Sequence, residues 1–308
     1  MGLSLAMPTI DEIEERHGGA GLAPARFFSG HKDQTQRCEK LRKLAPFVLT
    51  ALLIATALPL RSASPKLDPD QVSALLQKSM EKNQEYWNAA PDYEYVETDQ
   101  QRDGGTKTYQ ELMILGSGYE RLIAINGKPL SPQRDAQEEQ KLNTAISERR
   151  NESPEEREQR LAKEEQVRKR DHALIQEIPK GFDFEYLNEQ ELDGRECYVL
   201  QANPKAGYRP PNHETEVLKG ARGWIWIDKE TYNWVKAEAE VIRPVSIVAY
   251  LARVEPGTRF ELDMAPVSDG LWMPSHFTMR ARAKIFFVFP HESSQDESYY
   301  GYHKGAQY

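Results

Sequence analysis

Histidine and cysteine side chains, which supply many metal ligands and nucleophiles, are few in this sequence. After residue 64 there is one cysteine, Cys197, and none of the histidines has another histidine or a cysteine at zinc-ligand spacing. Ser275 and His276 are adjacent, but neighbours on a strand point to opposite faces and do not form a catalytic pair. We therefore predict no catalytic residue, no metal site and no cofactor. The histidines in question are His172, His213, His276, His291 and His303.

A glycine-serine motif, the acidic residues and Cys197 are the other candidates for chemistry in this sequence. Gly116-Ser117-Gly118 lacks the further glycine and the lysine of a phosphate-binding loop, so we interpret it as a turn. The sequence does not show which of its 48 Asp and Glu residues lie together in space. A cluster of titratable side chains in a cleft would favour an envelope enzyme such as a hydrolase. Cys197 lies in an apolar stretch, which predicts a buried strand residue.

Aromatic residues are the more informative set. Trp224 and Trp226 share one face of a predicted strand whose other face carries isoleucines, so both faces need cover. The segment 285–289 is also apolar on both faces. Core packing explains such strands, and the functional alternative is the mouth of a hydrophobic cavity. In that alternative the ligand-lining residues are Trp224, Trp226, Phe182, Phe184, Tyr186, Phe287 and Phe289.

An amphipathic helix is the first element that could position these side chains. The segment 67–87 has Asp68 as an N-cap and Pro69 at the first helical position. Its apolar residues recur at helical spacing and predict a face that covers the sheet as a lid. That lid face consists of Val72, Leu75, Leu76 and Met80.

Strands are expected in most of the remaining chain. Turn residues such as Asp103-Gly104-Gly105 separate alternating segments, which predicts antiparallel pairing. We expect about ten or eleven strands in an α+β, mainly antiparallel fold, a half-open β-barrel covered by helices. The expected strands are 93–97, 106–115, 119–125, 182–186, 196–201, 223–228, 233–242, 245–254, 258–264, 271–281 and 284–289, and 297–302 is a further candidate.

A charged helical insertion interrupts this sheet at residues 131–178. It holds ten Lys or Arg and twelve Asp or Glu residues. Ser131-Pro132 and the capping box at Ser153–Glu156 predict two helix starts. A solvated, charge-stabilised insertion and a mobile arm or lid over a binding face are both compatible with this pattern.

The N-terminal region predicts export. Residues 44–60 are uncharged and mostly apolar, with basic residues before them and small residues after them. This is the pattern of a signal peptide at 44–64, and a retained membrane anchor is the alternative. Residues 1–43 would then be an extension with a misplaced start, or a cytoplasmic tail if the anchor is retained. The single β domain at 65–308 has 32 basic and 42 acidic residues, so its net charge of −10 argues against nucleic-acid binding.

Two short motifs resemble the outer-membrane lipoprotein-sorting, or LolA-like, superfamily. Residues 223–228 resemble its G-x-x-W-I-D strand and turn, and residues 269–274 resemble its D-G-x-W-x-P turn. The resemblance implies a periplasmic half-barrel whose helices close over an acyl chain or another lipid. It also makes Arg121 the candidate for the arginine that locks the lid. The charged insertion after Pro129 departs from the carrier's pattern.

Three functions follow from these observations. The first is an exported carrier or sorting protein that binds a lipid or a lipidated protein in the half-barrel. The second is a protein-interaction or stress-sensor module that contacts an envelope protein through residues 131–178. The third is the envelope enzyme, which the missing catalytic motifs disfavour.

Overall fold

The computed structural model describes residues 66–101, 104–247, 252–267, 270–285 and 289–306. The predicted extension, the predicted signal segment and Phe287 lie outside this set. No helix within these ranges combines the length and the apolarity needed to cross a membrane.

The core element is an open antiparallel sheet of 13 strands, which confirms the predicted α+β class. Within the described residues its order is β4-β3-β2-β1-β13-β12-β11-β8-β7-β6-β5, with β10 beside β12 and β9 beside β10. The first strand therefore lies next to the last, which no local pattern in the sequence indicates. The strands are β1 (Tyr93–Gln100), β2 (Thr106–Ile114), β3 (Ser117–Ile125), β4 (Lys128–Pro129), β5 (Phe182–Leu192), β6 (Arg195–Pro204), β7 (Ala221–Asp228), β8 (Trp234–Val241), β9 (Val245–Ile247), β10 (Ala252–Val254), β11 (Arg259–Pro266), β12 (Trp272–Ile285) and β13 (Phe289–Lys304).

The predicted amphipathic helix is present as α2 (Pro69–Ala89), followed by the short helix η1 (Ala90–Asp92). Asp68 caps α2 and forms a capping box with Gln71, which satisfies backbone N–H groups of the first turn. The apolar face of α2 packs on the sheet in the main hydrophobic core, and the Trp234 indole donates a hydrogen bond to Ser79 Oγ over 3.3 Å.

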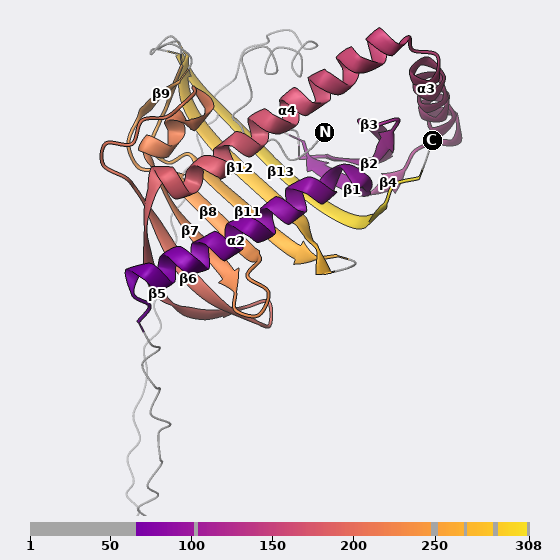
Figure 1. Ribbon diagram of the computed structural model, residues 1–308. Helices are drawn as coiled ribbons and strands as arrows, with labels where there is room; N and C mark the ends of the chain where they lie inside the picture. The colour runs from indigo at the N-terminus through magenta and orange to yellow at the C-terminus, as the bar shows by residue number, and fades with distance from the viewer. Residues whose placement is uncertain (1–65, 102–103, 248–251, 268–269, 286–288, 307–308) are drawn as a thin grey trace, which may run out of the picture. The chain divides into compact units, whose positions relative to one another are not determined.

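Two helices form the charged insertion, as predicted, and both start at the predicted serine caps. They are α3 (Pro132–Arg150) and α4 (Pro154–Gly181), capped by Ser131 and Ser153. The second helix ends three residues later than expected, because Pro179 is accommodated near its end. Figure 1 shows α2 and α4 crossing the same face of the sheet, and Ile175 of α4 shares the main core with α2. A six-residue 3₁₀ helix, η2 (Glu214–Lys219), packs against α4 near Leu174 and Ile178.

Four strand predictions need correction. The predicted strand 245–254 is two short strands, β9 and β10, which pair antiparallel with Val245 opposite Val254. The predicted strand 271–281 belongs to β12, which continues to Ile285 because no turn residue separates Ala281 from Lys284. The predicted strand 284–289 is not one strand, because Lys284 and Ile285 end β12 and Phe289 begins β13. The last predicted strand, 297–302, is the end of the 16-residue β13. The sequence of β13 is polar and therefore does not indicate a long strand. Its pairing with both β1 and β12 stabilises it.

Candidate functional site

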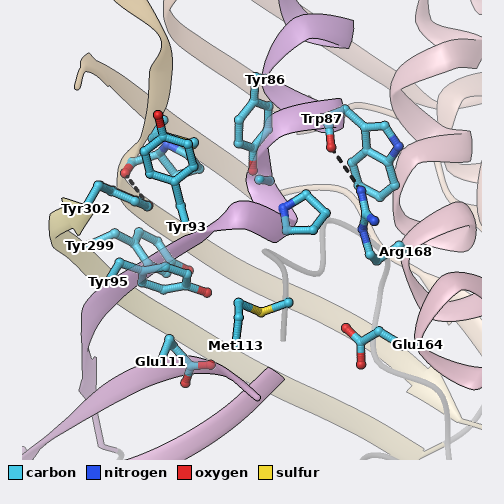
Figure 2. Close-up of a pocket in the computed structure, with 14 residues that line it drawn as sticks. Tyr86, Trp87, Tyr93, Tyr95, Glu111, Met113, Glu164, Arg168, Tyr299 and Tyr302 are labelled. Atoms are coloured by element: carbon cyan, nitrogen blue, oxygen red, sulfur yellow. Dashed lines mark hydrogen bonds between the residues drawn. The ribbon is translucent and has the colours of Figure 1, made fainter. Parts of the chain in front are cut away.

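A small cavity of about 80 Å³ lies between the sheet and the two helices that cross it. Such a volume holds several water-sized groups. The C-terminal end of α2, η1 and the middle of α4 meet strands β1, β2, β12 and β13 around it (Figure 2). The lining residues are Tyr86, Trp87, Ala90, Pro91, Tyr93, Tyr95, Glu111, Met113, Glu164, Arg168, Met273, Pro274, Tyr299 and Tyr302.

Tyrosine rings form the part of the cavity wall that the sheet contributes. The Tyr95 ring lies 5.1 Å from that of Tyr302 and 5.9 Å from that of Tyr299, measured between centroids. Tyr302 Oη donates a hydrogen bond to the Pro274 carbonyl over 2.8 Å. Burial raises the pKa of all three phenols well above the ordinary value, so they stay neutral at physiological pH. The wall is therefore aromatic and uncharged on this side.

A buried carboxyl group, Glu111, lines the same cavity from β2. Only 4% of Glu111 is exposed to solvent. Burial, which disfavours the charged carboxylate, is the largest cause that raises its pKa to about 7. Glu111 therefore changes its charge near neutral pH. Because its side chain lines the cavity, this charge faces the space that a ligand would fill.

Three more carboxyl groups lie together beyond Tyr95 and Tyr299. Strand pairing places Asp99 opposite Glu297 and Glu97 opposite Tyr299, so all four side chains share one sheet face. Ligand atoms of Glu97, Asp99 and Glu297 lie within 4.8 Å of one another. Tyr299 Oη donates a hydrogen bond to Glu297 Oε2. Glu97, Asp99 and Glu297 together form the carboxyl cluster.

The carboxyl cluster has the oxygen ligands that a hard cation prefers. Burial, and next the hydrogen bond to Asp99, raise the pKa of Glu97 to about 10. Glu97 thus carries a proton at neutral pH, and this proton already relieves the repulsion between the carboxyl groups. An ion would have to displace that proton, since metal ligands bind in deprotonated form.

A polar seam joins α2 to α4 above the cavity. Arg168 Nη2 donates to the Trp87 carbonyl over 2.9 Å, and its guanidinium lies 4.6 Å from the centroid of the Trp87 ring. The other partner of that ring is His172, stacked at 4.3 Å, which contacts Gln84 Oε1 at 2.9 Å. Burial and the charge of Arg168 lower the pKa of His172, so the stack is neutral at physiological pH.

Two arginines fix the helical insertion to the turn between β2 and β3. Arg149 donates to three backbone carbonyls of this turn, those of Ile114, Ser117 and Gly118, over 2.9 to 3.0 Å. Arg160 donates to the Leu115 carbonyl and to Ser117 Oγ, and it pairs with Glu152. The insertion is thus tied to the sheet by directional hydrogen bonds as well as by its apolar contacts.

Arg121, the candidate for a lid-locking residue, makes contacts on another helix. Its Nη2 lies 2.8 Å from Asp135 and 3.1 Å from Glu139, both on α3. It therefore joins β3 to α3.

Those predicted ligand-lining residues that the structure describes are not part of the cavity lining. Phe182 and Phe184 pack in a second core beneath η2, and Tyr186 belongs to the main core. Trp224 and Trp226 lie on the sheet face opposite to the buried Ile225 and Ile227, and Trp226 Nε1 donates to Gln190 over 2.9 Å. Phe289 is 63% exposed.

The predicted lid residues lie at the other end of α2. Val72, Leu75 and Leu76 are buried, and Met80 packs against the same core. They hold α2 on the sheet, whereas the last turns of the helix, with Tyr86 and Trp87, cover the cavity. The residues that line the cavity were not predicted from the sequence as ligand-lining residues. The alternation of Tyr95, Glu97 and Asp99 was a local signal, but its partners on β13 lie about 200 residues away along the chain.

Comparisons with known proteins complete this description. No protein-family model matches the chain, and no curated protein does. Solved structures do match. The chain is similar in structure to LolA-superfamily proteins. One is the LolA-superfamily protein from Nitrosomonas europaea, at 8% identity and a TM-score of 0.29, covering 75% of this chain and 94% of that one.

Two further structures have the same coverage pattern. A putative outer membrane lipoprotein-sorting protein domain from Vibrio parahaemolyticus is 13% identical, with a TM-score of 0.28, over 74% of this chain and 92% of that one. A DUF1329 family protein from Desulfovibrio piger is also 13% identical, with a TM-score of 0.28, over 77% and 94%.

Proposed function

We propose that this protein is an exported binding or carrier protein that takes up a lipid between its sheet and helices α2 and α4. The observation that carries the proposal is the cavity lined by aromatic and methionine side chains beneath these helices. Ligand sites of this kind combine apolar walls with a few polar groups that orient the ligand. The predicted signal segment at 44–64 supports a role in the cell envelope.

The cavity is too small for an acyl chain in its present form, so uptake requires the helices to separate. The contacts at the seam above it include one stacked pair, one cation–π contact and two hydrogen bonds, whereas the apolar contacts that α2 and α4 share lie in the main core. Such contacts are individually worth about 1 kcal/mol, so the closed arrangement is one that a ligand can displace. We expect ligand entry to occur at this seam.

Lipid analysis of the protein as cells make it tests this function. We expect lipids to co-purify with the full-length chain, and a fluorescent fatty-acyl probe to bind to the delipidated protein. The Ala90→Leu substitution fills the cavity from η1 and should weaken probe binding by about tenfold, whereas Ala136→Leu, on the exposed face of α3, should not. Absence of both co-purified lipid and probe binding would refute the proposal.

The seam can be tested separately from the cavity. Replacing Trp87 by Leu removes the stack with His172 and the cation–π contact with Arg168. Probe association should then become faster while the cavity floor is unchanged. An unchanged association rate would show that the ligand enters elsewhere.

The other two functions remain predictions. An enzyme would gain a proton-transfer group from Glu111, whose pKa is near neutral. Of the described residues, however, no serine, cysteine, threonine or histidine lines the cavity, so a nucleophile of these types is missing there. For the interaction module, deleting residues 131–178 should abolish partner capture and leave probe binding intact.

A further inference from the structure

We infer that the cavity takes a positively charged alkylammonium group, held by aromatic ring faces and by buried carboxyl groups. This inference rests on the assignment of the cavity as the ligand site and specifies the head group of the ligand. Three features of the lining support it, namely its rings, its charges and its size.

Aromatic side chains make up much of the cavity lining. Six aromatic side chains line it, and tryptophan and tyrosine rings attract cations through the negative potential of their faces. One ring already binds a cation in this structure, because the Arg168 guanidinium lies over Trp87. Figure 2 shows Tyr86, Tyr93, Tyr95, Tyr299 and Tyr302 grouped on the side of the cavity away from Arg168.

The charges around the cavity are mostly acidic. Among the described lining residues Glu111 and Glu164 are acidic, and Arg168, already engaged with Trp87, is basic. The carboxyl cluster adds Asp99 opposite Glu297 in strand register. Within this cluster the Glu97 proton and the hydrogen bond from Tyr299 Oη to Glu297 relieve the repulsion, so the acidic groups that a ligand would meet directly are Glu111 and Glu164.

An anionic head group fits this lining poorly. Carboxylates with little solvent access repel an anion strongly, because Coulomb interactions are strongest in surroundings of low dielectric constant. A bare metal ion also fits poorly, because ring faces cannot replace the oxygen ligands of its hydration shell. An alkylammonium group is larger, softer and more easily desolvated, and the cavity of about 80 Å³ has room for its substituents.

Dodecyl compounds that differ only in the head group provide the test. Dodecyltrimethylammonium, dodecylamine, dodecanol and dodecyl phosphate should be titrated against the full-length protein below their micellar concentrations, by displacement of the fatty-acyl probe. We expect the two ammonium compounds to bind about tenfold more tightly than dodecanol, and dodecyl phosphate more weakly still. Equal affinities would overturn the ammonium site and leave the lipid-binding function standing.

Free ethanolamine and tetramethylammonium separate the head group from the chain. If they bind by calorimetry while no dodecyl compound does, the ammonium site stands and the lipid function fails. If they displace dodecyltrimethylammonium, the source of the cation in cells is either a lipid head or a free amine, and lipid extraction decides between these two. No binding of any ammonium compound overturns the inference.

Matched variants locate the effect. Glu111→Gln keeps the shape of the side chain but removes its charge, and should reduce the preference for ammonium over dodecanol from about tenfold to less than about threefold. Glu185→Gln, at an exposed position of β5, is the control and should change nothing. Tyr302→Leu should weaken ammonium binding more than Tyr302→Phe does, because only Phe keeps the ring face. If Glu111→Gln affects dodecanol and ammonium compounds equally, the charge has no role and the inference is wrong.

Discussion

At the scale of single residues, the carboxyl groups of β1, β2 and β13 are the most unusual feature. Glu97 and Glu111 both have raised pKa values, chiefly because they are buried, and nearby acidic residues add to this effect. A raised carboxyl pKa means that the folded protein holds a proton that the unfolded chain has released. These residues therefore lower stability as pH increases, which is the opposite of the usual behaviour of acidic groups.

Glu111 gives a prediction for the pH dependence of stability. Its pKa is about 7 in the folded protein against 4.5 ordinarily, so the free energy of unfolding should fall as pH rises between these values. Glu111→Gln removes this component and should make the fall between pH 5 and 8 smaller, by on the order of 1 to 3 kcal/mol. Urea denaturation at several pH values measures it. The exposed Glu185→Gln variant should keep the wild-type dependence, and an unchanged slope in Glu111→Gln would contradict the assigned pKa.

Cys197 behaves at this scale as the sequence predicted. It is fully buried in β6, and burial raises the pKa of its thiol to about 11. The thiolate is therefore scarce at neutral pH, which makes this cysteine an unreactive core residue.

At the scale of elements, the helical insertion is anchored where its sequence is most charged. The turn between β2 and β3 has Leu115 and Gly116 in the left-handed region, at φ of 49° and 89°, which turns carbonyl oxygens toward α3 and α4. A guanidinium can bind several of these oxygens at once because its donors form a planar fork. The charged face is thus partly structural and not only solvated.

Arg149 should therefore be a stabilising residue, although it lies in a charged helix. Arg149→Met removes three hydrogen bonds to backbone carbonyls and should lower the free energy of unfolding by about 2 kcal/mol. The free energy of unfolding of Arg149→Lys should lie between those of the wild type and Arg149→Met, since an ammonium cannot reproduce the planar fork of donors. The neighbouring Arg150 is exposed, and Arg150→Met should have little effect in the same urea denaturation. Equal stability of both methionine variants would mean that the turn does not hold the insertion.

At the scale of the whole molecule, the position of the mature N-terminus decides how the domain is presented. The pattern at 44–64 predicts cleavage, so N-terminal sequencing of the protein from cells should give a start near residue 65. A lipid carrier that moves between membranes needs such release. A start near Met1 would instead indicate a membrane-anchored domain, and would limit lipid exchange to the membrane that holds it.

The fold and the candidate site differed in how well the sequence predicted them. Helix caps at Asp68, Ser131 and Ser153 were predicted correctly because capping involves residues three apart in the chain. The ligand-lining prediction relied on aromatic residues in apolar strands, and these residues lie in the cores, on the opposite sheet face or outside the described chain. The cavity instead uses tyrosines and acids from strands whose sequences are polar.

The sequence by itself determined the antiparallel strand-rich class, the amphipathic helix α2 and the two helices of the insertion, since propensity, caps and turns are local properties. Only the tertiary structure decided that β1 lies beside β13, and this pairing brings Tyr95, Glu97 and Asp99 together with Glu297 and Tyr299. Pairing between the two ends of a chain depends on the packing of everything between them. For that reason the site that carries the proposed function is a product of the whole fold.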